Sequence, residues 1–228
     1  MKILTRVLGI MFLVGLLAGC QAVGTAVGTA VDKTVAGSGN VQTETREVSG
    51  FTAVSLQGFG QVVIDQNGSE TLTITADDNF LPYITTEVRG GTLVIATTEK
   101  VLFTDVTELS YQISAKALNM VEVAGAGSMD VHNLSTDKWQ VKIPGAGSVT
   151  VDGQTTTQTV EINGAGNYNG ENLSSQETTI HSSGAGMAVV QVSDTLDVTI
   201  DGLGGVEYIG NPTVTQKING VGTVKQRQ

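Results

Sequence analysis

The sequence predicts an all-β fold in which short strands stack as the coils of a parallel β-helix, a solenoid. Three observations predict it. One phrase recurs at a nearly fixed period, apolar residues alternate strictly within each copy, and each copy is too short to hold a helix between two strands. The phrase reads apolar-x-apolar-x-Gly-x-Gly-x-apolar, and six copies follow one another between Val121 and Val224. A fixed period with one structural unit per copy is typical of solenoids.

The glycine pairs measure the length of each coil. The first glycines of successive pairs lie 20, 19, 20, 18 and 18 residues apart, which predicts coils of about 18–20 residues. A seventh copy stands alone upstream of the other six. The structural repeat glycines are Gly58, Gly60, Gly125, Gly127, Gly145, Gly147, Gly164, Gly166, Gly184, Gly186, Gly202, Gly204, Gly220 and Gly222.

Alternation within each copy identifies strands. In the first copy Val121, Val123, Met129 and Val131 share one parity, and small or polar residues occupy the other. A period of two belongs to a strand, because successive side chains point to opposite faces. A strand, a crossover helix and a returning strand need roughly 30 residues, more than one copy provides. Stacked coils would therefore place aliphatic residues on one another in one narrow core.

The paired glycines share the inward parity, and two physical accounts fit them. They bend the chain at a corner of the coil, or they leave room for a bulky neighbour. We favour the corner, with a nest of backbone amides for an anion as the functional alternative. The residue between the two glycines forms a regular outward column, which is either an apolar docking stripe or a steric necessity at the corner, and we favour the second. The column is Phe59, Ala126, Ala146, Ala165, Ala185, Leu203 and Val221.

Residues 1–19 have the pattern of an export signal. Lys2 and Arg6 form a positive start, and the apolar run from Val7 to Leu17 is too short for a comfortable membrane span. The residues from Leu17 to Cys20 resemble the bacterial lipobox. This resemblance implies cleavage before Cys20, a diacylglycerol thioether on its sulfur, and acylation of the new amino terminus, for example by palmitate. Two or three acyl chains make a durable membrane anchor.

The remaining chain is predicted to be a tether followed by one domain. Gln21, directly after the cysteine, implies sorting to the bacterial outer membrane, since an aspartate there tends to retain lipoproteins in the inner membrane. Residues 20–42 are rich in glycine, alanine, threonine and serine and are predicted to form a lipid-anchored flexible tether. Residues 43–228 form the solenoid domain. Its first part is predicted to be an irregular β section that covers one end of the stack. The expected elements are strands over 54–64, 71–76 and 109–115, one helical turn at 80–83 and a hairpin over 84–96.

Composition limits the partners. The 228 residues include 12 basic and 22 acidic side chains, a net charge of −10, which disfavours nucleic acid and unaided binding to anionic membranes. Cys20 is the one cysteine, so the chain has no internal disulfide and no cysteine metal cluster. We expect no cofactor and no metal.

The sequence gives little support for a catalytic site. Parallel β-helices also carry polysaccharide lyases and hydrolases, whose sites need clustered carboxylates on one outer face. Glu122 and Glu161 share a repeat position but lie two coils apart with Lys142 between them, which predicts a charge-compensated ladder. His132 and His181 occupy different repeat positions and should not share a metal. The outward carboxylates are Glu122, Asp130, Asp152, Glu161, Asp201 and Glu207.

Two further features have competing interpretations. The segment from Asp65 to Glu70 is as rich in oxygen atoms as a calcium loop, but it lacks the twelve-residue spacing and a terminal glutamate, so a turn is favoured. Three aromatic residues could stack on sugars: Trp139, Tyr168 and Tyr208. The parity of Tyr168 and Tyr208 places these two in the core instead.

Three features together resemble one known family. They are the segment from Val48 to Phe51, the segment from Ala76 to Ile84, and the Gly-Ala-Gly copies that follow. The chain resembles the putative auto-transporter adhesin head GIN domain over about residues 48–224. The resemblance implies a right-handed parallel β-helix in a bacterial envelope protein, often a lipoprotein. It implies no catalytic residues.

These observations together favour a non-enzymatic lipoprotein of the cell envelope that serves as a binding, adhesion or structural module. Its expected partners are the membrane, through the lipid on Cys20, and a glycan or an envelope protein. The alternative is a carbohydrate-active enzyme, a polysaccharide lyase or hydrolase, on the same scaffold.

Overall fold

The computed structural model describes residues 33–98 and 101–227. The chain divides into two compact units, Met1–Ala30 and Val31–Gln228, and the described residues belong to the second. Cys20 and residues 1–19 lie outside the described residues. The domain boundaries at 20–42 and 43–228 therefore remain predictions, although Lys33–Ala36 forms a strand, β1, that pairs with β8, Val101–Thr104.

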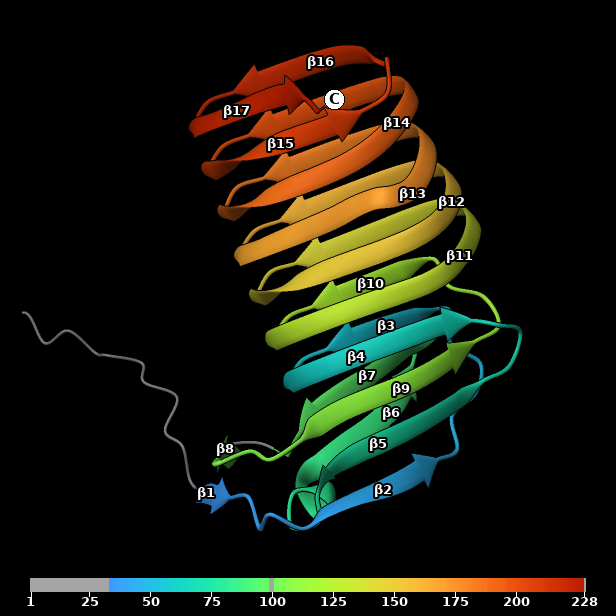
Figure 1. Ribbon diagram of the computed structural model, residues 1–228, viewed down its shortest axis with the longest axis vertical. Helices are drawn as coiled ribbons and strands as arrows, with labels where there is room; N and C mark the ends of the chain where they lie inside the picture. Colours follow the sequence, from blue (N-terminus) through green and yellow to red (C-terminus); the bar gives the residue numbers. More distant parts are fainter. Residues whose placement is uncertain (1–32, 99–100, 228) are drawn as a thin grey trace, which may run out of the picture. The chain divides into compact units, whose positions relative to one another are not determined.

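The second unit is a parallel β-solenoid of about five turns, which confirms the predicted fold class (Figure 1). Four long, curved strands make its body, and each strand runs from one glycine corner around the coil to the next corner. Neighbouring coils pair in parallel and in register, so the repeat glycines and the residues between them stack on their equivalents. The four strands are β11 (Ala126–Ile143), β12 (Ala146–Ile162), β13 (Ala165–Ser182) and β14 (Ala185–Ile200).

Each coil contributes to two opposing faces, and both faces continue into the shorter strands at the two ends of the stack. On the first face the order is β2-β5-β9-β4, then β11 to β14, then β15 and β17. On the second face the order is β6-β7-β3-β10, then β11 to β14, then β16. The short strands are β2 (Val41–Arg46), β3 (Ala53–Leu56), β4 (Phe59–Gln66), β5 (Thr71–Asp77), β6 (Ile84–Arg89), β7 (Thr92–Thr97), β9 (Leu109–Ala115), β10 (Met120–Val123), β15 (Leu203–Ile209), β16 (Thr213–Ile218) and β17 (Val221–Gln226).

The predicted irregular opening section is confirmed. Strands β5, β9 and β2 pair antiparallel, as do β6 and β7, and they cover the N-terminal end of the parallel stack. The predicted helical turn is a 3-10 helix, η1, at Leu81–Tyr83. Arg46 joins the two faces at this end, because its guanidinium donates to the carbonyl of Ile84 at 2.7 Å and to that of Leu81 at 3.2 Å.

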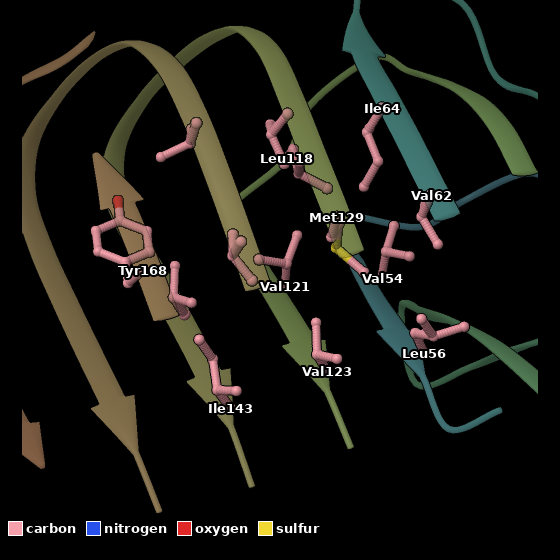
Figure 2. Close-up of a cluster of buried hydrophobic side chains, with 14 of the residues drawn as sticks. Val54, Leu56, Val62, Ile64, Leu118, Val121, Val123, Met129, Ile143 and Tyr168 are labelled. Carbon is pink, nitrogen blue, oxygen red and sulfur yellow. The ribbon is translucent and has the colours of Figure 1, made fainter. Parts of the chain in front are cut away.

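The core is a set of stacked aliphatic columns. One column runs through six consecutive rungs, each residue paired directly with the next. Figure 2 shows its first two members, Val54 and Val121, among the buried side chains. Burying a side chain of this size stabilises the fold by about 1.5–3 kcal/mol, so one such column contributes on the order of 10 kcal/mol before entropy is counted. The six residues are Val54, Val121, Val141, Val160, Ile180 and Val198.

The C-terminal end differs from the covered N-terminal end. Strands β16 and β17 each pair on one side, within the described part of the chain. Lys217 and Lys225 lie on these edge strands and Arg227 directly follows β17, a common protection against edge-to-edge association. Two of them are paired with acids of earlier coils, Lys225 with Glu207 at 2.9 Å and Arg227 with Glu171 at 3.0 Å.

Candidate functional site

A groove of about 930 Å³ follows the wide bend of the solenoid. The wide bend is the turn at which each long strand passes from the first face to the second; it lies on the right of Figure 1, opposite the glycine corners. The groove crosses five consecutive coils, from Ser135 in β11 to Asn211 just before β16. Because this concave surface continues across five coils, it is our candidate site.

The floor of the groove is a column of small residues turned toward the interior. Thr155 and Ser175 are buried, and their hydroxyls are engaged by the protein itself. Thr155 donates to the carbonyl of Thr157 at 3.0 Å, and Ser175 donates to that of Gln191 at 2.8 Å. In this column Thr, Ser and Gly take most of the positions that aliphatic residues occupy on the faces, and Val192 is the exception. The floor column is Thr136, Thr155, Ser175, Val192 and Gly210.

The walls of the groove are polar and carry almost no charge. Among the fourteen lining residues that the structure describes, eleven bear a hydroxyl or a carboxamide, and Asp137 is the one charged side chain. Gln154, Thr156, Ser174 and Gln176 are exposed, and their side chains have no hydrogen-bond partner among the described residues. The walls therefore offer unused donors and acceptors. One wall is Ser135, Gln154, Ser174 and Gln191, and the other is Asp137, Thr156, Gln176, Ser193 and Asn211.

Glutamine side chains hold both ends of the groove. At the N-terminal end Gln66 bonds the backbone of Ser135 twice, accepting from its amide at 3.1 Å and donating to its carbonyl at 3.2 Å. At the C-terminal end Gln226 donates to the carbonyl of Gly210 at 2.6 Å. These bonds fix the backbone of the first and last coils that line the groove.

A chain of buried hydrogen bonds supports the groove from inside. The hydroxyl of Tyr168 donates to Gln158, whose amide donates to Thr178 at 3.2 Å. The hydroxyls of Thr178 and Ser175 lie 2.8 Å apart, which connects the chain to the floor. Burial raises the pKa of Tyr168 well above its ordinary value, so its hydroxyl stays protonated as a donor. The interior behind the groove is therefore polar in part, beside the aliphatic columns that the sequence predicted.

The differences in coil length are absorbed at the wide bend. Pairing between β11 and β12 shifts between Val131 and Leu134, and pairing between β12 and β13 shifts between Thr150 and Asp152. Pairing between β13 and β14 shifts twice, after Gly170 and after Ser175. Elsewhere in these three strand pairs the pairing continues without a shift. Variable segments on a rigid scaffold are where binding residues concentrate.

The glycine corner is closed by backbone contacts. The first glycine of each pair lies at the corner where the chain passes from the second face of one coil to the first face of the next, as the corner interpretation predicted. A Cβ added to Gly145 would lie 2.1 Å from the carbonyl oxygen of Gly125, so the coils can approach closely at this column because it lacks side chains. The other paired glycines show similar clashes except Gly58, which begins the column. Backbone approach therefore explains most of them, and a positive φ is found at Gly60 and Gly204.

The corner does not form an anion nest in the body of the solenoid. The amide of Gly145 donates to the carbonyl of Val123 at 3.1 Å, and that of Ala146 donates to Gly125 at 2.9 Å. The same bonds recur in the following coils. These amides are hydrogen-bonded to carbonyl groups of the preceding coil and are not free to bind an anion. The anion alternative is therefore wrong for this column. The residues between the glycines stack in one ladder, and Ala126, Ala146, Ala165 and Ala185 are exposed on it.

The outward carboxylates are dispersed, and most of them have partners. Glu122, Lys142, Glu161 and His181 form one ladder, which confirms the predicted charge compensation. Glu207 pairs with Lys225, whose hydrogen bond lowers the pKa of that carboxyl. Ser55 donates to Glu122 at 2.6 Å, Gln61 to Asp130 at 3.4 Å, and Asn219 to Asp201 at 2.6 Å.

Both histidines are exposed, and each faces a carboxylate in the next coil. His132 Nδ1 lies 2.6 Å from Asp152, and His181 Nε2 lies 3.7 Å from Asp201. Partial burial raises the pKa of Asp152, but the amide of Asn133 and the ring of His132 outweigh it and hold the value below the ordinary range. Within the described residues, no three His, Cys, Asp or Glu side chains are grouped so that they could hold a metal ion.

One aromatic prediction is wrong, and two are confirmed. Trp139, considered as a stacking surface for sugars, is buried with 1% of its surface exposed. Its position continues the inward parity of Val141, so its ring fills the core where the second face begins. Tyr168 is buried and Tyr208 is half-buried against the core, as predicted.

Two sequence features prove to be structural. In the segment from Asp65 to Glu70, Asn67 accepts from the amide of Ser69 at 3.1 Å, while Glu70 accepts from Gly50 and Lys116, each at 2.8 Å; this is a turn held by internal bonds. Asp77 is buried and accepts from the amides of Gly39 and Thr107 at 2.8 and 2.9 Å. Its burial raises the pKa, but these amides outweigh the burial and lower it overall.

Comparisons with known proteins can now be set beside this geometry. A family model described as "Putative auto-transporter adhesin, head GIN domain" matches residues 50–212. The chain belongs to this family. No curated protein matches it. The matched range of the head GIN domain takes in the groove and all repeat glycine pairs except the last.

Solved structures share this head GIN domain fold. A putative adhesin from Bacteroides fragilis is 23% identical, with a TM-score of 0.68, and the match covers 85% of this chain and all of the other. A structure described as a putative lipid binding protein, from Parabacteroides distasonis, is 18% identical, with a TM-score of 0.58, and the match covers 86% of this chain and all of the other. At these identities the likeness establishes the fold. Within the described residues, no helix has the length and apolar character needed to span a bilayer.

Proposed function

We propose that this chain is a non-enzymatic adhesion-type module of the cell envelope, and that it binds its ligand in the wide-bend groove. The groove carries the proposal, because it combines an internally bonded floor with exposed walls on which the side chains of Gln154, Thr156, Ser174 and Gln176 have no hydrogen-bond partner among the described residues. Rigid sites bind with less loss of conformational entropy than mobile ones. Membership of a family named for adhesins and the adhesin titles of similar folds support the same class of function.

The proposal includes a lipid anchor at Cys20 and a location at the bacterial outer membrane. Its support is the lipobox-like sequence before Cys20 and the placement of Gln21 after it. Twelve residues lie between Cys20 and Lys33, the first described residue, so a fully extended tether would reach about 45 Å from the lipid. Such a tether would present the solenoid to neighbouring envelope components.

The absence of catalytic groups from the groove favours binding over turnover. Hydrolysis of a glycosidic bond by the usual route needs two carboxyl groups on either side of the scissile bond, about 5–10 Å apart. Asp137 is the one carboxylate among the described lining residues, and the lining contains no His, Lys or Arg. A carbohydrate-active enzyme remains the competing candidate, because it would use a related ligand on the same scaffold.

One experiment separates the two candidates. Cells expressing the full chain are tested for retention on immobilised envelope polysaccharides and envelope proteins, and the supernatant is assayed for released sugars. We expect retention without release, and loss of retention in the double variant Gln154→Ala/Gln176→Ala but not in Thr179→Ala, an exposed residue on the second face of the same coil as Gln176. Release of sugars that stops with Asp137→Asn or Asp152→Asn would establish the enzyme instead. If the groove variants are retained as well as wild type, the groove is not the binding site.

Cys20 has its own test. Cells are fed an alkyne analogue of palmitate, and the chain is examined for label and for its membrane fraction. Wild-type chain should carry the label in the outer-membrane fraction, and Cys20→Ser should carry none. Equal labelling of the two would refute the anchor without affecting the groove.

A further inference from the structure

We propose that the ligand of the groove is a linear, uncharged polysaccharide that lies along the solenoid axis with about one sugar unit per coil. This inference rests on the proposed function, since it assumes that the groove is the binding site, and it specifies the class of ligand.

The walls repeat at a spacing that suits a sugar chain. Ser135, Gln154, Ser174 and Gln191 are paired rung by rung in parallel register, so equivalent groups recur about every 4.8 Å along the axis. An extended, equatorially linked sugar chain has a comparable rise per unit. Each unit would therefore meet a similar set of hydroxyl and amide groups in each successive coil. The surface of a globular protein without stacked coils has no such linear period.

The chemistry of the walls favours a ligand that carries many hydroxyl groups. Ser, Thr, Gln and Asn side chains donate and accept at once, as sugar hydroxyls do. Gln154 and Gln176 stand on opposite walls of adjacent coils with both amide groups free among the described residues. Binding would therefore add hydrogen bonds without breaking internal ones.

Charge disfavours the other candidate ligands. Asp137 lies among the lining residues and no basic side chain does, while the whole chain carries a net charge of −10. A uronic-acid polymer would be repelled rather than neutralised. A protein ligand is disfavoured for a different reason: its binding energy usually comes from aromatic and arginine anchors in apolar pockets, and Val192 is the one apolar side chain among the described lining residues.

The number of coils sets the length of the bound segment. The groove spans five coils, hence four spacings of about 4.8 Å or roughly 19 Å, enough for about five sugar units. The described lining contains no aromatic ring to stack on a sugar, so each unit gains energy from hydrogen bonds alone. Affinity should therefore be weak for a disaccharide, rise with each added unit, and level off at about five.

The test measures binding of the full chain, held in detergent, to neutral gluco-, manno- and xylo-oligosaccharides of two to eight units by calorimetry. Oligogalacturonates of the same lengths are the charged comparison. We expect at least one neutral series to bind with affinity that rises to about five units and then levels off. Gln154→Ala/Gln176→Ala should bind that series about tenfold more weakly, the loss expected for two hydrogen bonds, and Thr179→Ala should match wild type.

Three results would overturn the inference: no binding by any neutral series, affinity that does not change from the disaccharide upward, or tighter binding of the oligogalacturonates. Each is distinguishable from failure of the proposed function. If cells still lose retention with the groove variants while neutral oligosaccharides do not bind, the groove is a binding site for a different ligand. If the groove variants change neither measurement, both proposals fail.

Discussion

The narrow corner and the wide bend both reverse the chain once per coil, but they do so with opposite chemistry. At the corner, glycines such as Gly145 bring backbone against backbone, and the amides are consumed by the coil below. At the bend, the coils differ in length, and exposed side chains such as Gln154 and Gln176 are left unpaired among the described residues. The corner therefore sets the stacking register, whereas the bend is free to vary and to bind.

The largest effect should come from the corner. In Gly145→Ala the new methyl group would lie 2.1 Å from the oxygen of Gly125 and 2.5 Å from that of Ala124, both backbone atoms that cannot turn away. The coils must separate, and we expect a loss of about 3 kcal/mol or more in the free energy of unfolding, measured with urea. The neighbouring exposed residue provides the control: Ala146→Ser should leave the urea midpoint unchanged. Equal midpoints for both variants would contradict the role of the corner.

The second-largest effect should come from inserting one residue, because the wide bend and the glycine corner should tolerate the insertion differently. One glycine inserted after Gln176, at the bend, should cost about 1 kcal/mol or less, because coils of different length already meet there. The same glycine inserted after Gly164, at the corner, breaks a continuous ladder and should cost several times more. Thermal unfolding of both insertions measures the difference. A bend insertion as damaging as the corner insertion would show that the bend is not a tolerant segment.

The buried network behind the groove should give a moderate effect. Tyr168→Phe removes the hydroxyl that donates to Gln158 and leaves a buried amide oxygen without that donor. An unsatisfied buried acceptor costs about 1–3 kcal/mol, which urea unfolding can measure. Gln158→Leu alone would also remove the amide that donates to Thr178, so Thr178→Val is added with it, and the triple variant should recover part of the loss. A triple variant less stable than Tyr168→Phe would show that the network does not act as a unit.

The smallest effect should be a change in acid sensitivity at the start of the bend. The folded-state pKa of Asp152 is lowered, so its contribution to stability is present above the unfolded pKa of about 3.9 and is lost as the pH falls through the folded value. Asp152→Asn should therefore lower stability at neutral pH and flatten its decline below pH 4. Unfolding midpoints from pH 7 to pH 2.5 measure this. A decline that keeps its slope in the variant would exclude Asp152 as a contributor.

The faces and the corner could be predicted from the sequence because both have rigid local patterns. Alternation around Val121 and Val141 identified the inward columns, and the glycine pairs identified the corner. Trp139 was misjudged although the signal was present, since it lies two residues before Val141 and shares its inward parity. Extending the alternation by one step would have placed it in the core.

The groove could not be predicted for a physical reason. Its floor and walls lie where coils change length, so Ser135, Gln154, Ser174 and Gln191 stand 8, 7, 8 and 5 residues after the second glycine of their copies. No fixed spacing aligns them, and alternation fails where the chain bends. The pairing across coils brings them into one column, and that pairing is visible only in three dimensions. Runs of Ser, Thr, Gln and Asn in the same part of each copy were the one available signal.

The most direct test of this division of roles measures stability and binding in the same variant. Gln154→Ala/Gln176→Ala is compared with wild-type full chain for its urea midpoint and for its retention on immobilised neutral polysaccharide. We predict an unchanged midpoint together with lost retention, because the side chains of Gln154 and Gln176 are exposed and make no hydrogen bonds with other described residues. Unchanged retention, or a fall in the midpoint like that of Gly145→Ala, would contradict the account of the bend as a binding surface separate from the structural corner.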